Sequence, residues 1–154
     1  MLTPEGSDTL WVETETGLFR YAGARFDRVP GTASLRVTDV QRASDGALLI
    51  GAHTGLFRYD AGALRPFTPE LEDVLVRSII EDAEGNLWMA TDGEGLFRYR
   101  PTPFAHYTPE DGLAGNVVWD VERGPAGDLW IATRNGMSRF DGTTFTGVPG
   151  PGGQ

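Results

Sequence analysis

The sequence predicts an all-β protein made of four repeats, and three observations support this prediction. A Gly-Leu-Phe-Arg-Tyr phrase begins at Gly17, Gly55 and Gly95 and returns in altered form at Gly136, so successive copies start 38, 40 and 41 residues apart. A short apolar segment of strand type precedes each copy, and no segment shows the apolar period of a helix. A fixed period of about 40 residues is typical of a repeat architecture.

The third repeat shows the strand pattern most clearly. Residues 87–91 and 96–99 are apolar runs of strand length, and the glycine-rich segment 92–95 between them supplies a tight turn. An isolated hairpin of this size is barely stable in water, so the repeats must pack on one another. Residues 87–90 are all apolar, which indicates a strand covered on both faces.

Each complete repeat contains four candidate strands, which we name a to d in chain order. They are expected at residues 9–14, 18–21 and 25–29 in the first repeat, and at 37–41, 47–52, 56–59 and 64–67 in the second. They are expected at 76–80, 87–91, 96–99 and 104–107 in the third, and at 118–121, 129–133, 137–140 and 144–148 in the fourth. Residues 1–7, with Pro4 and Gly6, are expected to be too broken to form strand a of the first repeat. Proline-containing connections at 68–70 and 108–110 are expected to break any helix.

Four short antiparallel strands in about 40 residues match one blade of a β-propeller. We therefore expect residues 1–154 to form a single β-propeller domain or part of one. The repeats are expected at residues 7–35, 36–74, 75–115 and 116–148, the first without its inner strand, and a flexible tail at 149–154.

The composition excludes several classes of function. The formal net charge is −9 and all basic residues are arginine, which argues against binding to a nucleic acid backbone. The absence of cysteine excludes disulfides and thiolate chemistry. No apolar run approaches the length that spans a membrane, so direct membrane insertion is not expected. The first residues also lack the basic and apolar regions of a secretion signal.

Catalytic and metal-binding patterns are weak. His53 and His106 are expected on different parts of a blade, which does not favour a paired metal or catalytic site. Residues 82–86 are only faintly similar to a calcium loop, and the equivalent turns lack the same carboxylates, so a hairpin turn is favoured. No nucleophile elbow or phosphate-binding glycine loop is present. We expect no catalytic residue, no metal and no cofactor.

Comparison among the repeats separates framework positions from candidate binding positions. The recurring arginines, Arg20, Arg58, Arg98 and Arg139, are expected to make a repeated structural pair with acidic or backbone groups rather than a ligand-binding ring. Trp88 is expected to be buried between blades, and Trp119 to be at least partly exposed.

The b–c turns and the second residue of strand a differ among the repeats. In a propeller these positions crowd one mouth of the central channel. Their side chains offer stacking, charge and hydrogen bonds, which suits a polar small molecule such as a carbohydrate; solvated loops without a ligand are the alternative. The candidate ligand-binding residues are Arg77, Trp119, Thr38, His53, Asp92, Glu94, Arg134 and Asn135.

The third repeat resembles the two-component regulator propeller repeat. It carries Val76-x-x-Ile79-x-Glu81-Asp82, then Gly85-Asn86-Leu87-Trp88-x-x-Thr91-x-x-x-Gly95-Leu96, and closes with Phe104-x-x-Tyr107-Thr108-x-x-Asp111-Gly112-Leu113. The second repeat departs at Leu49, where the family usually has tryptophan, and the fourth departs at Gly124 and Ser138.

The resemblance implies the periplasmic, ligand-sensing region of a bacterial hybrid two-component sensor or a related membrane-bound signalling enzyme. We accordingly expect a non-catalytic binding segment whose ligand shifts the geometry of a membrane-linked partner domain. A protein–protein interaction scaffold is the alternative. A propeller lyase or glycan-cleaving enzyme is a third hypothesis. Such an enzyme would need an acidic and a basic side chain at the channel mouth.

The chain is expected to be an incomplete arc of blades. Its partners would be the remaining propeller blades or another chain, and in solution the isolated chain would self-associate or aggregate. The hydrophobic flanks expected to be exposed include Leu10, Trp11, Trp130 and Ile131.

Overall fold

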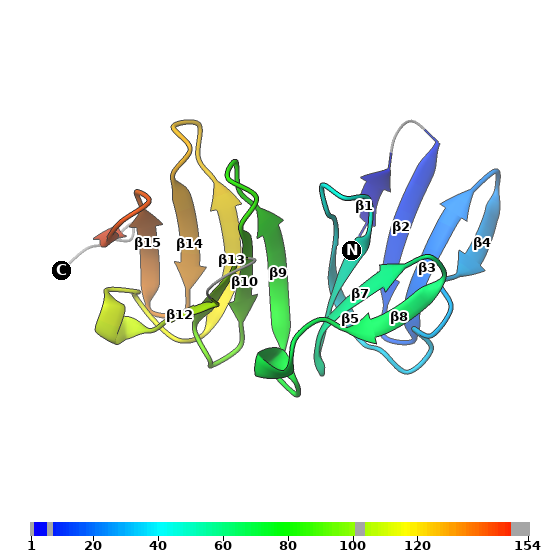
Figure 1. The fold of residues 1–154 in the computed structure, drawn as a ribbon, viewed down its shortest axis with the longest axis horizontal. Helices are drawn as coiled ribbons and strands as arrows, with labels where there is room; N and C mark the ends of the chain where they lie inside the picture. Colours follow the sequence, from blue (N-terminus) through cyan, green and yellow to red (C-terminus); the bar gives the residue numbers. More distant parts are fainter. Residues whose placement is uncertain (1, 6–7, 101–103, 149–154) are drawn as a thin grey trace. The chain divides into compact units, whose positions relative to one another are not determined.

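The chain is all-β in its computed structural model, which describes residues 2–5, 8–100 and 104–148 (Figure 1). The described strands form four sheets, each of four antiparallel strands that follow one another in sequence. Such four-stranded meanders are the blades of a β-propeller, so the predicted fold class is confirmed. The chain divides into two compact units, Met1–Val76 (the first unit) and Arg77–Gln154 (the second unit).

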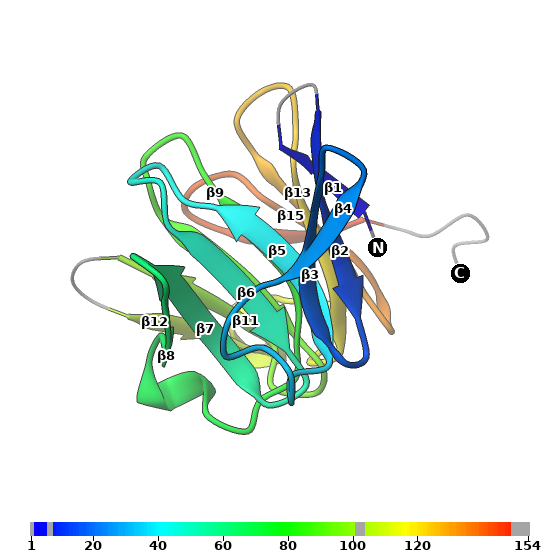
Figure 2. The same cartoon turned by 90° about the vertical axis from the view of Figure 1, so that its right-hand side faces the viewer.

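The first unit holds the first and second blades (Figure 2). The first blade consists of β1 (Leu2–Glu5), β2 (Thr9–Thr14), β3 (Gly17–Ala22) and β4 (Arg25–Arg28), and the second of β5 (Val37–Arg42), β6 (Leu48–Ala52), β7 (Gly55–Asp60) and β8 (Ala63–Pro66). Apart from Val76, the second unit holds the third and fourth blades. The third consists of β9 (Val76–Glu81), β10 (Leu87–Thr91), β11 (Leu96–Tyr99) and β12 (Ala105–Tyr107), and the fourth of β13 (Val118–Arg123), β14 (Leu129–Thr133), β15 (Gly136–Phe140) and β16 (Phe145–Val148).

Strand β1 corrects one expectation, because the first blade does not lack its inner strand. Leu2–Glu5 pairs antiparallel with β2, with Leu2 opposite Val12 and Glu5 opposite Thr9. Pro4 is tolerated because β1 lies at the edge of its sheet, where only one side of the strand must supply hydrogen bonds.

The two proline connections also differ from expectation, because each forms one turn of 3₁₀ helix, η1 (Pro69–Leu71) and η2 (Pro109–Asp111). Proline suits the first turn of a helix, where its missing N–H would have no partner. In η2 the Asp111 carboxylate accepts the Thr108 N–H at 2.9 Å, which closes a capping box. The prolines therefore exclude a longer helix but not a single turn.

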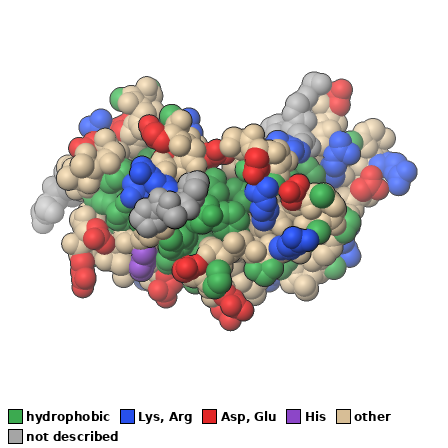
Figure 3. All heavy atoms as spheres, viewed as in Figure 1, with side chains coloured by type: hydrophobic (Ala, Val, Ile, Leu, Met, Phe, Trp, Pro, Cys, Tyr) green, Lys and Arg blue, Asp and Glu red, His purple; other side chains and the backbone are tan. Residues whose placement is uncertain are grey.

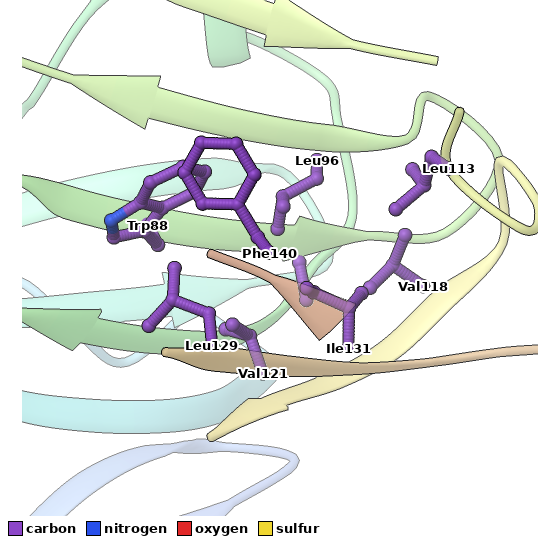
Figure 4. Close-up of a cluster of buried hydrophobic side chains, with 9 residues drawn as sticks. Trp88, Leu96, Leu113, Val118, Val121, Leu129, Ile131 and Phe140 are labelled. Atoms are coloured by element: carbon purple, nitrogen blue, oxygen red, sulfur yellow. The ribbon is translucent and has the colours of Figure 1, made fainter. Parts of the chain in front are cut away.

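The core of the second unit lies between its two sheets (Figure 4). Trp88 and Leu96 of the third blade pack against Leu129, Ile131 and Phe140 of the fourth. Trp88 is 1% exposed, and its ring centroid lies 5.2 Å from that of Phe140. Burying an aromatic side chain of this size removes roughly 150–250 Å² from water, so this contact dominates the packing of the two blades.

The core of the first unit repeats this arrangement. Trp11 and Leu18 of the first blade belong to the same buried cluster as Val40, Leu48 and Ile50 of the second blade. The position of Trp88 is occupied by Trp11 in the first repeat, and that of Leu96 by Leu18. The two units thus use one packing solution twice.

Burial along strand b agrees only in part with the sequence prediction. Every residue of β6 and β10 is buried, as expected for a strand covered on both faces. In β2 and β14 burial alternates, because successive residues of a strand point to opposite faces. Leu10 and Trp130 are accordingly half-buried, whereas Trp11 and Ile131 are buried inside their own units and are not exposed flanks.

Three of the recurring arginines show how the framework uses this position. The predicted pairing is confirmed for Arg58, whose guanidinium lies 2.9 Å from the Asp45 carboxylate, and for Arg139, which donates to Asp128. Arg98 instead places its guanidinium 5.4 Å from the centroids of the Trp88 and Tyr107 rings, a cation–π arrangement.

The carboxylate of Asp82 holds the indole of Trp88. Asp82 Oδ2 accepts from Trp88 Nε1 and from Asn86 Nδ2, both at 2.7 Å, and Oδ1 accepts the Asn86 and Glu84 amides at 2.8 and 3.0 Å. Burial favours a raised pKa for Asp82, but the hydrogen bonds from Trp88, Asn86 and Glu84 outweigh it and hold the pKa below its usual value. The turn at residues 82–86 is therefore a structural hairpin.

The fourth blade supplies its carboxylate from a different position. Gly124 stands where the third repeat has Asp82, and Asp128 stands where it has Asn86. A Cβ atom on Gly124 would lie 2.2 Å from Asp128 Oδ1 and 2.7 Å from Trp130 Nε1, so the Asp128 carboxylate already fills the space beside the indole. Hydrogen bonding from Arg139 is the main cause of the lowered pKa of Asp128, and Trp130 contributes.

The Asp82 contact predicts a loss of stability in acid. Because folding lowers the pKa of Asp82, its contribution is fully present above the pKa of an unfolded aspartate, about 3.9, and disappears as the pH falls through the folded-state value. The unfolding free energy of Asp82→Asn, from urea titrations at a series of pH values, should lie below that of the wild type at pH 7 and approach it below about pH 4. Glu84→Gln, in the same turn, is the matched control. A gap for Asp82→Asn that is constant with pH would contradict this account.

The exchange of carboxylate positions predicts an energetic coupling between residues 124 and 128. Gly124→Asp alone should destabilise the chain by about 1–3 kcal/mol through overpacking, and Asp128→Asn alone removes the ion pair with Arg139. The double variant Gly124→Asp/Asp128→Asn recreates the third-blade arrangement. Its loss in urea unfolding should be smaller than the sum of the single losses by about 0.5–3 kcal/mol. Strictly additive losses would show that the two turns are not equivalent.

Candidate functional site

Trp119 is presented by a β-bulge on the inner strand of the fourth blade. Val118 pairs with Thr133 and Asp120 pairs with Ala132, so Trp119 is an extra residue without a partner on β14. Its side chain is 51% exposed. Bulges redirect a side chain and are frequent next to functional sites, and this one places a large aromatic ring in solvent.

Thr38 occupies the same bulge in the second blade, between the pairs of Val37 and Asp39 with β6. The residue after each bulge is an aspartate whose carboxylate accepts the next amide: Asp39 from Val40 at 2.8 Å and Asp120 from Val121 at 3.0 Å. Sequence reasoning chose the bulged positions because they vary but did not predict the bulge. The aspartate that follows in both repeats was the available signal.

Arg77 and Asp92 form an ion pair, with 2.5 Å between Arg77 Nη2 and Asp92 Oδ2. Both side chains are partly exposed, 39% for Arg77 and 31% for Asp92. A partly exposed pair of this kind contributes little to stability, about 0–1 kcal/mol, and offers hydrogen-bond donors and acceptors together at the surface.

The b–c turn of the third blade is fixed to the start of the fourth. The Asn116 carbonyl accepts the Gly93 amide at 3.1 Å and the Gly95 amide at 2.7 Å, and Asp92 forms a β-bridge with Val117. Gly95 has φ +81°, and a Cβ there would lie 2.4 Å from the Tyr107 carbonyl oxygen, so the turn requires glycine. Asn116 was missed from the sequence because it acts through its backbone.

The b–c turn of the fourth blade meets the same segment. The Arg134 amide donates to the Val117 carbonyl at 2.9 Å. Asn135 lies beside Gly115, where a Cβ would come within 3.2 Å of the Asn135 amide group. Both Arg134 and Asn135 are exposed. The backbone of Val117 therefore pairs with Asp92 and accepts the Arg134 amide, so both predicted residues contact the segment that leads to Trp119, two positions later.

Glu94 is placed apart from Arg77. It is exposed, and its carbonyl contacts the ring of His106 on β12, which is stacked on Phe97 at a centroid distance of 4.3 Å. Strand β12 is at the opposite edge of its sheet from β9, the strand of Arg77.

Two candidates, Thr38 and His53, belong to the first unit. Both are half-buried. The Thr38 hydroxyl donates to the Val76 carbonyl, and the His53 amide donates to the Arg36 carbonyl at 3.1 Å. The candidates thus divide into two in the first unit and six in the second.

The second-unit cluster, defined as Arg77, Asp92, Trp119, Arg134 and Asn135, contains five of the six candidate residues of the second unit. It combines an exposed indole, an arginine–aspartate pair and exposed side chains at Arg134 and Asn135. Among the described residues, no group of three or more His, Cys, Asp or Glu side chains is placed to hold a metal ion. Basic and acidic side chains are interspersed on the face shown in Figure 3, rather than gathered into one basic patch.

Two segments of the chain are similar to a known repeat family. Residues 70–93 and 112–135 match the sequence profile of the two component regulator propeller. A stretch of 42 residues, 27% of this chain, is 48% identical to histidine kinase P4 of Formosa agariphila and spans 3% of that protein.

Solved structures share the fold at low sequence identity. The extracellular domain of BT3049 from B. thetaiotaomicron, assigned to a hybrid two component system, has a TM-score of 0.76 and 19% identity, over 94% of this chain and 21% of that one. The extracellular domain of BT4673 from the same organism, assigned to a one component system, has a TM-score of 0.79 and 22% identity, over 91% and 21%. Virginiamycin B lyase from Staphylococcus aureus has a TM-score of 0.74 and 18% identity, over 97% and 55%.

These findings agree with the motifs of the third repeat. The matched segments contain the turn at Asp82, strands a and b of the third and fourth blades, and the first two residues of each b–c turn. The resemblance inferred from the sequence is thereby confirmed over two segments, residues 70–93 and 112–135, which are similar to the two component regulator propeller.

Proposed function

We propose that the chain is an extracytoplasmic ligand-sensing segment of a bacterial two-component signalling protein, and that it binds its ligand without catalysing a reaction. The propeller repeats and the local identity to a histidine kinase support the signalling role. The chain spans about a fifth of the sensor domains it matches in fold, so the activity of the whole protein is part of the proposal. No helix within the described residues is long and apolar enough to cross a membrane.

The exposed Trp119 on its bulge is the observation that carries the binding role. An indole in solvent offers a flat apolar surface to a ligand. The β-bulge at Trp119 places this indole in solvent. The Arg77–Asp92 pair adds hydrogen-bond donors and an acceptor. The pair is linked to the segment of Trp119, because Asp92 forms a β-bridge with Val117, two residues before Trp119. Polar small molecules with one apolar face and many hydroxyls, such as carbohydrates, match this combination.

Catalysis of the lyase or glycosidase kind would need an acid and a base close to the bound ligand. Among the described residues of the second unit, Asp92 is engaged by Arg77, and His106 lies on β12 in contact with Glu94 and Phe97. This arrangement favours binding over catalysis.

A protein–protein interaction scaffold is the second candidate, and one observation favours it. Phe26 on the outer strand β4 is 63% exposed, although its ring contacts Tyr21 at a centroid distance of 4.7 Å. Exposed aromatic residues are enriched in protein interfaces.

The sensing role predicts that Arg77→Ala/Trp119→Ala impairs the response to ligand. The variant is placed in the full-length signalling protein, and reporter output is measured against inducer concentration. Loss of stacking and of charged hydrogen bonds should raise the half-maximal concentration at least about tenfold, since 1.4 kcal/mol corresponds to a factor of ten.

The matched control is Arg65→Ala/Phe26→Ala, which removes an exposed arginine and an exposed aromatic residue from the outer strands of the first unit. The control should leave the dose–response curve unchanged. An unchanged curve for Arg77→Ala/Trp119→Ala would refute the proposed site. A shift in the control alone would favour the scaffold function.

A further inference from the structure

A second pocket lies between the third and fourth blades, at the strand ends opposite the b–c turns. It is lined by the a–b turns of both blades, the end of β11 and the start of the c–d turn of the fourth blade, and its volume is about 480 Å³. Trp88 and Phe140, whose rings pack together in the core of the second unit (Figure 4), also line it. Pockets that bind small molecules have volumes of about 300–1,000 Å³, so this pocket is large enough for a ligand.

Arg98 and Arg100 bring two positive charges into this pocket. Arg98 lies on β11 and Arg100 directly follows this strand, and residues two apart on a strand point to the same face. Both charges act on one ring: burial raises the pKa of Tyr107, and the positive charges of Arg98 and Arg100 oppose that rise. Like charges placed side by side repel each other, and a bound anion would remove this repulsion.

The position of Arg100 carries the opposite charge in two other repeats. Asp60 stands there in the second repeat and Asp141 in the fourth. In the second blade the recurring arginine, Arg58, lies 3.5 Å from Asp60 and 2.9 Å from Asp45. The third repeat therefore replaces an acidic residue at this position with a second arginine. A position that departs from the repeated framework in this way is a candidate for binding.

Arg98 has no carboxylate partner among the described residues. Its guanidinium lies over the rings of Trp88 and Tyr107, and its Nε–H is buried without a hydrogen-bond acceptor. Buried donors in folded proteins nearly always have an acceptor, and one without it requires an explanation such as an absent ligand. The unpaired donor of Arg98 therefore marks a place for an acceptor in the pocket.

We propose that this pocket binds a small molecule through a carboxylate or phosphate group held by Arg98 and Arg100. The guanidinium group is planar and donates N–H groups in a fork that matches the oxygens of either anion. The buried Nε–H of Arg98 would gain its missing acceptor, and the repulsion between the two arginines would be removed. The site shares no residue with the surface around Trp119, so it does not depend on the proposed sensing function.

Four carboxylates also line the pocket and limit the charge of the ligand, namely those of Asp82, Glu84, Asp128 and Asp141. Asp82 and Asp141 accept backbone amides of their own turns, and Asp128 is paired with Arg139. These three carboxylates therefore leave Arg98 and Arg100 available to a ligand. They would repel a molecule with several negative groups, so the expected ligand carries a single carboxylate or phosphate.

Titration of the ¹⁵N-labelled chain with sodium acetate and with inorganic phosphate, at an ionic strength kept constant with sodium chloride, tests the proposal. The Arg98 Nε–H signal, assigned by its loss in Arg98→Lys, should shift and saturate with at least one of the two anions. The anion that saturates at the lower concentration identifies the preferred group. A signal that does not shift, or shifts without saturation in both titrations, would overturn the proposal.

Arg100→Asp gives the third repeat the acid found in the second and fourth. The new carboxylate should pair with Arg98, so the half-saturating anion concentration should rise at least about tenfold. The variant should be at least as stable as the wild type in urea, because an attraction replaces a repulsion. Arg65→Asp, at an exposed arginine of the first unit, changes the net charge equally and should bind like the wild type. Unchanged binding or lost stability in Arg100→Asp, or equally weakened binding in Arg65→Asp, would refute the site.

Discussion

The packing of the second unit depends on the hydrogen bond of a buried indole. Trp88 is 1% exposed and lies at the centre of the contact between two blades. A buried N–H without an acceptor costs about 1–3 kcal/mol, which would offset much of what burial of the ring contributes. Asp82 removes that cost through Oδ2, and the turn at residues 82–86 orients the carboxylate with two backbone amides. The hairpin turn and the core are thus parts of one arrangement.

The same framework also positions the proposed binding surface. Arg77 and Trp119 lie on strands β9 and β13. Asp92 lies in the b–c turn of the third blade, which is fixed by the Asn116 carbonyl and by the bridge between Asp92 and Val117. The bulge that exposes Trp119 leaves Val118 and Val121 facing the core. Variation at the bulged position therefore changes the surface without disturbing the packing between blades.

The sequence predicts the strands well because strand and turn signals are local. Glycine turns and apolar runs such as residues 87–91 are visible without any knowledge of partners. The features that were missed depend on pairing. Strand β1 forms because β2 is available as a pairing partner. Asn116 acts through its backbone carbonyl, so its side chain gives no signal. The bulge at Trp119 arises from the pairing register of β13 with β14, which the sequence of β13 alone does not show. The sequence shows that the carboxylate lies at position 82 in the third repeat and at the position equivalent to Asn86, Asp128, in the fourth. That each carboxylate lies beside an indole could be recognised only from the structure.

Hydrogen exchange at the indole N–H groups tests the central claim most directly. The four tryptophans give four indole signals in a ¹H–¹⁵N spectrum, and single Trp→Phe substitutions assign them. If Asp82 holds Trp88 between the blades, the Trp88 indole proton should exchange as slowly as the most protected backbone amides of β10, whereas that of the exposed Trp119 should exchange at once. A Trp88 indole proton that exchanges as fast as that of Trp119 would contradict the account.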